Sequence, residues 1–252
     1  MSKFTLSNSY INDLKQLHPA LTKNELDRKA IIIGSNFGSN IGFHINNKLV
    51  ENKISTRCYN KNTLNMTHQN LPVEEDHDIL VLANGYTYLE WIENLTDDKI
   101  SQMINDTFLS SVRATNQFVK ATIKNPYKKY IIFIGSMAYK NVLNGSSVYC
   151  ASKAAISHFS KCVAWELAPK GYNVITINPS NTEGTPMTEE TIKGLMRYRG
   201  LDRKQAENYW GAILPKHKWL QPNEIADICS FFVSGKSDYM SGTQIDLSGG
   251  QR

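Results

Sequence analysis

The sequence predicts an α/β fold in which a doubly wound parallel sheet of about seven strands carries helices on both faces. Short apolar runs alternate along the chain with segments whose apolar residues recur at helical spacing, and this alternation is typical of parallel sheets with crossover helices. Motifs span the 252 residues from end to end, which favours one domain over two. We expect a single domain over residues 25–252, preceded by a surface extension over residues 1–24.

The first predicted strand leads into a glycine-rich turn. Residues 29–34 form a short apolar run that ends in glycine, as expected of a buried parallel strand. Two more glycines follow before helix-like sequence over residues 43–52. Glycines let the backbone approach a pyrophosphate, and the free amides at a helix start bind it. The candidate phosphate-binding residues are Gly34, Ser35, Asn36, Phe37, Ile41 and Gly42.

The remaining elements continue the alternation. Predicted strands cover residues 53–60, 78–85, 130–135, 173–178 and 241–250. Predicted helices cover residues 98–121, the segment that starts near Tyr149, and a segment that starts at Pro222. Only eighteen residues separate Asn60 from Ile79. The helix expected between these two strands must therefore be shortened or absent.

Residues 136–153 carry the candidate chemistry. Tyr149 and Lys153 are four positions apart in a helical segment, so the phenol and the ammonium share a face. A free phenol has a pKa of about 10, and a positive charge about 4 Å away supplies about 4 kcal/mol, nearly enough to activate it near neutral pH. Ser136 follows the apolar run 130–135, so it lies at the carboxyl end of a buried strand, where ligands of open α/β sheets gather. A bare Tyr-Lys pair at this spacing is usually two neighbours on a solvated face, but the serine and the glycine-rich turn favour a site.

Together, Ser136, Tyr149-x-x-x-Lys153 and the glycine-rich turn resemble the short-chain dehydrogenase/reductase family, over about residues 26–250. The resemblance implies a Rossmann fold and an NAD(P)-dependent oxidoreductase that reduces a ketone or oxidises the alcohol. Tyr149 would exchange the proton, Lys153 would lower its pKa and hold the cofactor ribose, and Ser136 would bind the substrate oxygen. It points first to 3-oxoacyl thioester reductases, whose acyl chain rides on a carrier protein.

Two alternatives stay open. The turn between Gly34 and Gly42 is two residues longer than is usual in the family and is similar to that of enoyl-thioester reductases, although those separate their tyrosine and lysine by six residues. A cofactor-binding regulator without turnover is the other alternative. Relatives carry an asparagine in the middle of the helix at 98–121 that holds a water for proton relay. Here the position is Thr107, or Phe108 if the alignment slips by one, with Asn105 nearby.

The resemblance also implies further cofactor contacts. Residues 56–62 contain no acid that would bind a ribose 2′-hydroxyl, and Lys61 falls where NADP-dependent relatives often carry a basic residue. NADP is therefore favoured, with NAD as the alternative, unless Lys61 is only a solvated loop lysine. Besides Tyr149 and Lys153, the remaining candidate cofactor contacts are Asn60, Lys61, Ala83, Asn84, Gly85, Pro179 and Thr182.

Residues 185–219 match the place where such enzymes keep a substrate lid. Basic residues gather there and leave a net charge of +5 against Asp202 and Glu207; they are Lys193, Arg197, Arg199, Arg203, Lys204, Lys216 and Lys218. These charges are either simply solvated or recruit an anionic substrate or an acidic carrier protein.

The composition of the chain argues against nucleic-acid, metal and membrane partners. A net charge of +5 without an aromatic-basic stripe does not favour nucleic acid. The cysteines and histidines lack metal-ligand spacing, so we expect no metal and reduced cytoplasmic thiols. No run approaches the roughly 20 apolar residues that span a bilayer, so we expect no membrane partner. The family resemblance at residues 241–250 suggests a homodimer or homotetramer.

Overall fold

A six-stranded parallel sheet forms the centre of the described chain. The computed structural model describes residue 23 and residues 27–35, 40–66 and 69–251, with residues 210–213 described by their backbone alone. Of the extension predicted over residues 1–24, only Lys23 lies among them. The strand order is β2-β1-β3-β4-β5-β6. The strands are β1 (Lys29–Ile33), β2 (Ser55–Tyr59), β3 (Ile79–Leu82), β4 (Lys129–Ile134), β5 (Tyr172–Pro179) and β6 (Gln244–Leu247).

The expectation of about seven strands is wrong by one in the described residues. Each of the six predicted runs coincides with one observed strand, and β2 forms the edge of the sheet beside β1. A further edge strand would need two crossovers between β2 and β3. The linking segment is too short for them, and its described residues 60–66 and 69–78 hold no helix or strand. The expected shortening of this link is therefore confirmed.

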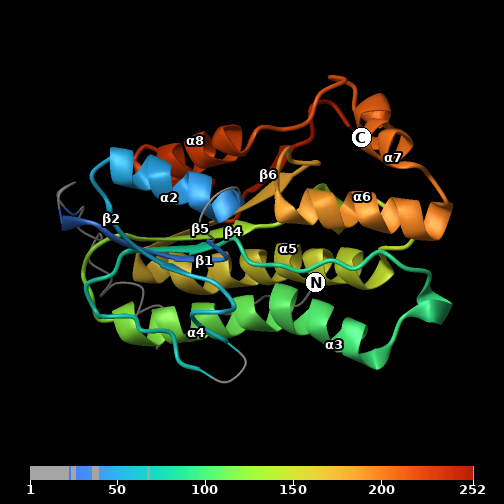
Figure 1. The fold of residues 1–252 in the computed structure, drawn as a ribbon. Coiled ribbons are helices and arrows are strands. Elements are labelled where there is room, and N and C mark those ends of the chain that lie inside the picture. Colours follow the sequence, from blue (N-terminus) through green and yellow to red (C-terminus); the bar gives the residue numbers. More distant parts are fainter. Residues whose placement is uncertain (1–22, 24–26, 36–39, 67–68, 252) are drawn as a thin grey trace, which may run out of the picture.

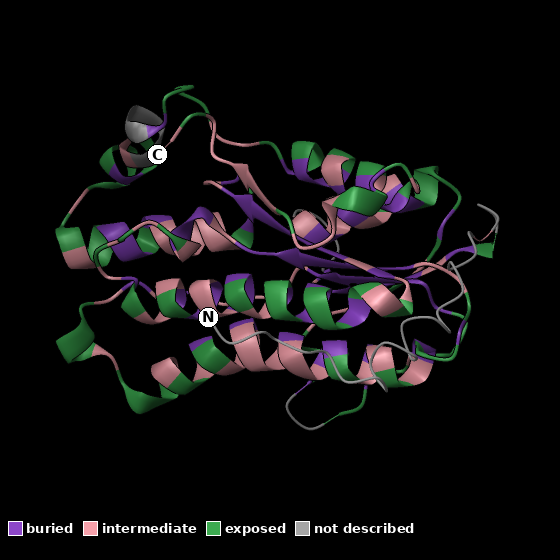
Figure 2. Cartoon of the chain, turned by 180° about the vertical axis from the view of Figure 1, so that it is seen from behind, coloured by how far each residue is buried: buried purple, intermediate pink, exposed green. Residues whose placement is uncertain are grey.

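Helices cover both faces of the sheet (Figure 1). α2 (Ile41–Glu51) and α8 (Pro222–Val233) lie on one face, while α4 (Ser110–Thr122) and α5 (Ser147–Leu167) cover the other. Successive strand residues point to opposite faces, so Ile32 packs with α2 and α8, while Ile31 and Ile33 pack with α4 and α5. Figure 2 shows the result: the inner strands β1, β3, β4 and β5 are mostly buried, whereas the edge strand β2 and the outward faces of the helices carry exposed residues. This confirms the doubly wound architecture.

The predicted helix at 98–121 has an irregular centre. It consists of α3 (Asp97–Ile104), a π-helical segment (Asn105–Leu109) and α4. Thr96 caps its start by accepting a hydrogen bond from the Lys99 amide at 3.4 Å. A π-helical turn inside an α-helix frequently marks a functional site. Here it lies at the residues that the sequence aligned with the relay asparagine.

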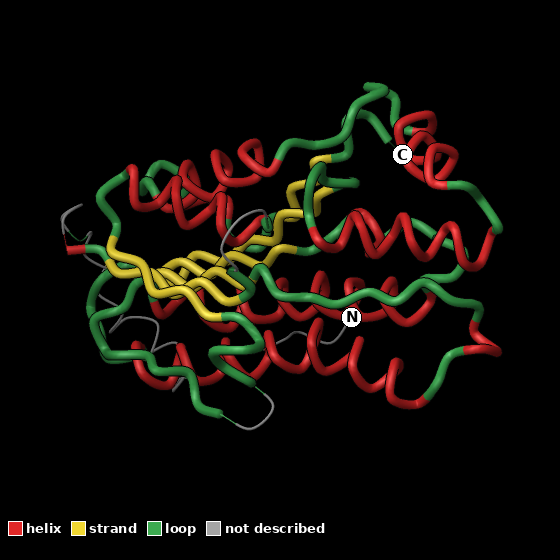
Figure 3. The backbone as a smooth tube through the Cα atoms, viewed as in Figure 1, coloured by secondary structure: helices red, strands yellow, loops and turns green. Residues whose placement is uncertain are grey.

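The segment predicted as a lid contains two helices. α6 (Pro186–Arg199) begins after its cap Thr185 and ends at Gly200, whose φ is +66°, and α7 (Arg203–Ile213) follows. In Figure 3 the loop after β3 runs outward between α5 and α6. Short 3₁₀ segments complete the description at Ile92–Asn94, Met137–Tyr139, Ala168–Lys170 and Asp238–Met240. No helix within the described ranges combines the length and apolarity needed to cross a bilayer.

Candidate active site

At Gly34 and Gly42, on either side of the turn after β1, the backbone leaves no room for a side chain. Gly34 has φ of +91°, and a Cβ there would lie 2.5 Å from the backbone of Ala83. A Cβ on Gly42 would lie 2.7 Å from the Gly34 carbonyl oxygen, so α2 starts directly against the turn. Asn40 caps α2 by accepting a hydrogen bond from the Phe43 amide at 2.9 Å, and the first turn carries no acid. These residues fit a dinucleotide pyrophosphate, which needs close backbone and an uncompensated helix start. Asn36 and Phe37 lie outside the described residues.

A cavity of about 460 Å³ opens at the carboxyl edge of the sheet. Twelve predicted site residues line it: Gly34, Ile41, Asn60, Lys61, Ala83, Asn84, Gly85, Ser136, Tyr149, Lys153, Pro179 and Thr182. Ser35 and Gly42 are buried and do not line the cavity, and the Ser35 carbonyl accepts a hydrogen bond from Nδ2 of Asn60, a wall residue, at 3.4 Å. The parallel register explains the gathering, because Ile33 pairs with Leu82, and Leu82 pairs with Phe133, so the loops that follow meet at one edge.

Ser136, Tyr149 and Lys153 come together in this cavity. Ser136 lies two residues beyond the end of β4, its Oγ accepts a hydrogen bond from the Ala138 amide at 3.2 Å, and its side chain also hydrogen-bonds Tyr149. Lys153 Nζ donates to the carbonyl oxygen of Ile134, the last residue of β4, at 2.8 Å. The same Nζ lies 5.8 Å from the centroid of the Tyr149 ring. The helical spacing has therefore placed the phenol and the ammonium on one face, as predicted.

The protonation of the pair differs from the expectation. Burial raises the pKa of Tyr149 to about 12, and the Ser136 hydrogen bond opposes this only in part. Burial also lowers the pKa of Lys153 to about 8. The free energy lost by removing the phenolate from water exceeds the stabilisation that the Lys153 ammonium provides, because that ammonium is directed at the Ile134 carbonyl. The predicted lowering of the phenol pKa by Lys153 is absent from this arrangement.

None of the three candidate relay positions has a described contact with Lys153. Thr107 is buried and exchanges two hydrogen bonds of 3.2 Å with the backbone of Tyr86. Phe108 packs edge-on against Phe159, with ring centroids 6.1 Å apart. No hydrogen bond within the described residues joins Asn105 to Lys153 either. Asn84 holds the π-helical turn instead, donating to the carbonyl oxygen of Asp106 at 2.8 Å.

The basic residues of the lid segment are not part of the cavity wall. Arg203 bonds both Glu189 and Glu207, and Arg197 pairs with Glu90 at 3.4 Å. The charged residue that α6 contributes to the wall is Glu190. The predicted positive charge is therefore directed to the outside and to neighbouring carboxylates. Any attraction of an anion by this segment acts from a distance.

Several residues of the cavity wall were not predicted from the sequence. The hydroxyl of Tyr149 contacts Met187 Sδ at 3.4 Å, and Tyr86 and Glu190 also line the cavity. Asn40 could have been found, because asparagine before an apolar helical run is typical of a helix cap. Met187 and Glu190 carry no such signal, since their approach depends on how α6 folds over the sheet.

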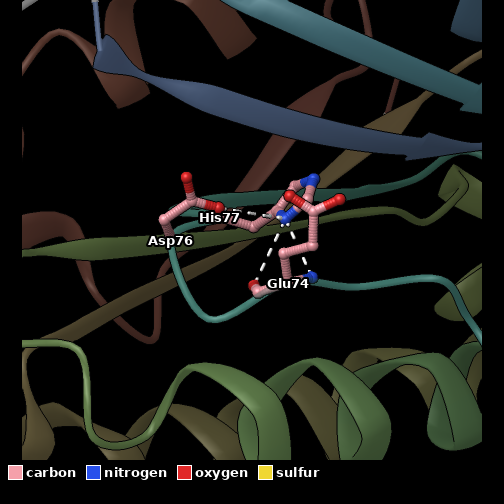
Figure 4. Close-up of side chains that lie close together, drawn as sticks. All are labelled: Glu74, Asp76 and His77. Carbon is pink, nitrogen blue, oxygen red and sulfur yellow. Dashed lines mark hydrogen bonds and ion pairs between the residues drawn. The ribbon is translucent and has the colours of Figure 1, made fainter.

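A second cluster of polar side chains lies away from the cavity wall (Figure 4). Glu74, Asp76 and His77 come close enough to share an ion, but the carboxylates already have partners. Arg57 pairs with Glu74 at 2.6 Å, and Lys29 pairs with Asp76. His77 Nδ1 accepts a hydrogen bond from the Glu74 amide at 3.0 Å. The cluster is therefore an ion-pair network at the start of the sheet.

Comparison with known proteins identifies the class. The family described as Enoyl-(Acyl carrier protein) reductase matches residues 62–252. A 3-oxoacyl-(acyl-carrier-protein) reductase of Buchnera aphidicola is 28% identical over 219 residues, covering 84% of this chain and 78% of that protein. An NAD⁺-bound xylitol dehydrogenase superposes with a TM-score of 0.78 at 19% identity, covering 90% of this chain and 100% of that chain. An actinorhodin polyketide ketoreductase with NADPH superposes with a TM-score of 0.75 at 18% identity, covering 90% of this chain and 98% of that chain.

The fold and the family match together define an NAD(P)-dependent oxidoreductase. The chain belongs to the short-chain dehydrogenase/reductase family, in the branch described by the enoyl reductase name.

Proposed function

We propose that this protein catalyses the NADPH-dependent reduction of a ketone to an alcohol, with a 3-oxoacyl thioester as the substrate. The observation that carries the proposal is one continuous cavity. Its wall runs from the glycine turn and the start of α2 to Ser136, Tyr149 and Lys153. A dinucleotide and a carbonyl substrate need such a connection, because the reacting atoms must come within about 3–3.5 Å of each other.

The cofactor would lie along the carboxyl edge of the sheet. Gly34 and the α2 start would hold the pyrophosphate, Ala83 and Gly85 would line the nucleoside, and Pro179 and Thr182 would border the nicotinamide. When bound, the reduced nicotinamide supplies hydride to the carbonyl carbon. The protein's part is to place the carbonyl and to supply a proton to its oxygen.

Tyr149 would supply that proton. Its neutral form is favoured by burial, which raises its pKa to about 12 and keeps the proton available for donation. Ser136, already hydrogen-bonded to Tyr149, would share in binding the substrate oxygen as negative charge develops on it. Lys153 would hold the cofactor ribose, and with its ammonium engaged there its positive charge would stabilise the phenolate that donation leaves behind. Its present bond to the Ile134 carbonyl supports this role, since that bond fixes the ammonium beside the cavity.

Lys61 supports NADP over NAD. It is exposed, lines the cavity and has no ion-pair partner among the described residues. A 2′-phosphate would therefore find an uncompensated cation. NAD stays the alternative cofactor.

The substrate proposal rests on the curated relative, which is named as an acyl-carrier-protein reductase. The family description favours an enoyl-thioester reductase as the second candidate. The three-residue gap between Tyr149 and Lys153 favours the ketone reductase. Purified protein should be given acetoacetyl and crotonyl thioesters with each cofactor. Oxidation of NADPH by the acetoacetyl thioester supports the proposal, oxidation by the crotonyl thioester alone supports the second candidate, and cofactor binding without either supports a regulator.

We also propose a homodimer or homotetramer located in the cytoplasm. Trp165 of α5 is 82% exposed, and burying this large apolar side chain against a second copy would be favourable. The four cysteines are free, which supports a reducing compartment. Light scattering at micromolar concentration would test the oligomer.

A further inference from the structure

Tyr86 lies beside the reacting end of the cavity. It follows Gly85, where an added Cβ would lie 3.4 Å from Lys153 Nζ, and its ring packs in one cluster with Tyr149 and Met187. Its amide donates a hydrogen bond to Thr107 Oγ1 and its carbonyl oxygen accepts one from the same hydroxyl, and these two bonds fix its backbone. Tyr86 lines the cavity. Tyr86 therefore lies on the wall of the same cavity, and in the same apolar cluster, as the phenol that we propose as the acid.

The hydroxyl of Tyr86 has an unused proton. Lys99 of α3 donates a hydrogen bond to this hydroxyl at 3.0 Å. An ammonium carries donors only, so the phenol oxygen accepts that bond and its own O–H remains to be donated. No described residue accepts it. A phenol that accepts a hydrogen bond from a cation is polarised into a stronger donor. The hydrogen bond raises the pKa of Lys99, so the ammonium stays charged at neutral pH.

The charges around this donor are balanced. Lys99 stacks 4.9 Å from the Tyr88 ring centroid, and the Arg197 guanidinium lies 4.3 Å from the same centroid. Glu90 pairs with Arg197, and Glu190 both lines the cavity and attracts Lys99 electrostatically. With two acids against two bases, the wall offers a directed donor without a surplus of positive charge. Such a site suits a neutral oxygen better than a carboxylate.

We propose that the Tyr86 hydroxyl, positioned by Lys99, binds a second, uncharged oxygen of the substrate while Ser136 and Tyr149 bind the ketone oxygen. Tyr86 and Lys99 would thus select a β-keto ester or thioester by binding the acyl carbonyl of that substrate. This inference rests on the proposed function and names the residues that recognise the second carbonyl.

The test compares two substrates that differ in one oxygen. Ethyl acetoacetate has the second carbonyl, and the ethoxy ketone of equal chain length has a methylene in its place. Tyr86→Phe should lower kcat/KM for ethyl acetoacetate about tenfold, chiefly through KM, and change it less than twofold for the ethoxy ketone, since a lost hydrogen bond from a polarised donor has about that effect. Lys99→Met should give a smaller loss in the same direction, and Lys99→Arg should restore it. Tyr88→Phe is the matched control, because Tyr88 shares the Lys99 stack but not the cavity wall.

Equal losses with both substrates, or a weaker cofactor Kd in Tyr86→Phe, would show that Tyr86 supports the fold or the cofactor and would overturn the inference. Unchanged kinetics would overturn it as well. Dissociation constants of the two matching alcohols, measured by calorimetry with oxidised cofactor present, give the same ratio without turnover. A wild-type protein that reduces neither ketone and also leaves the acetoacetyl thioester unreduced would overturn the proposed function, while the alcohol ratio would still decide this inference.

Discussion

Two buried lysines, whose ammonium groups lie near opposite ends of β4, show how a functional site differs from a position where burial alone perturbs a pKa. Lys129 starts the strand, is 1% exposed and donates to the Asn125 carbonyl at 2.6 Å. Lys153 is 3% exposed and donates to the carbonyl of Ile134, where the strand ends. Burial lowers the pKa of each to about 8. Only Lys153 lines the cavity, so the perturbed pKa alone does not identify function.

The first prediction separates these two lysines by activity. Lys153→Met should lower turnover of a β-keto ester at least ~100-fold and weaken cofactor binding, because it removes the group proposed to stabilise the phenolate and hold the ribose. Lys129→Met should leave turnover within about twofold. Steady-state kinetics and cofactor titration on both variants decide the matter. Comparable losses in both would mean that the activity follows stability rather than the cavity.

The second prediction contrasts two glycines with positive φ. Gly34→Ala should destabilise the protein by more than about 2 kcal/mol, because strain adds to a clash with the Ala83 backbone. It should also abolish measurable cofactor binding. At Gly200 an added Cβ meets nothing within 4 Å, so Gly200→Ala should cost only about 1 kcal/mol and leave binding intact. Urea unfolding and calorimetry measure both. Equal costs would show that strain, and not the tight turn, governs Gly34.

The third prediction concerns the cofactor half of the cavity. Lys61→Asp should raise the Kd of NADPH about tenfold and that of NADH less than threefold, since it replaces a cation with an anion beside the 2′-phosphate. Lys124→Asp makes the same charge change at an exposed position off the cavity wall and should leave both constants unchanged. Fluorescence titration would measure them. A parent protein that binds the two cofactors equally removes the argument for NADP.

The fourth prediction is a small effect of pH on stability. The folded-state pKa of Lys129 is about 8 against 10.5 in the unfolded chain, so the unfolded chain binds the extra proton between these values. The desolvation cost of this lysine is therefore fully present below pH 8 and fades as pH rises to about 10.5. The gain in unfolding free energy of Lys129→Met over the parent should therefore be about 1–2 kcal/mol larger at pH 7 than at pH 10.5. Urea unfolding of both proteins at the two pH values measures it. A difference that does not change with pH would show that the Lys129 ammonium is solvated.

The fold and the reacting groups could be predicted from the sequence because both follow from the local spacing of residues. Period and apolar runs placed all six described strands, and a four-residue interval placed Tyr149 and Lys153 on one helix face. The link between β2 and β3 is too short for a seventh strand, and this shortness is visible in the sequence. The phenol pKa was predicted wrongly, because the direction of the Lys153 ammonium depends on the Ile134 carbonyl. Met187, Glu190 and the Lys99 bond to Tyr86 depend on how distant segments fold over the cavity, which spacing does not encode.

The central claim is that Tyr149 is the acid of a ketone reductase, and Tyr149→Phe tests it most directly. The variant and its control Tyr139→Phe, whose hydroxyl bonds Asp246 away from the cavity wall, should be measured with ethyl acetoacetate and saturating NADPH. We predict that Tyr149→Phe lowers kcat at least ~100-fold with cofactor affinity and unfolding midpoint nearly unchanged, while Tyr139→Phe retains parental rates. A Tyr149→Phe variant that reduces the ketone at near-parental rate would contradict the account.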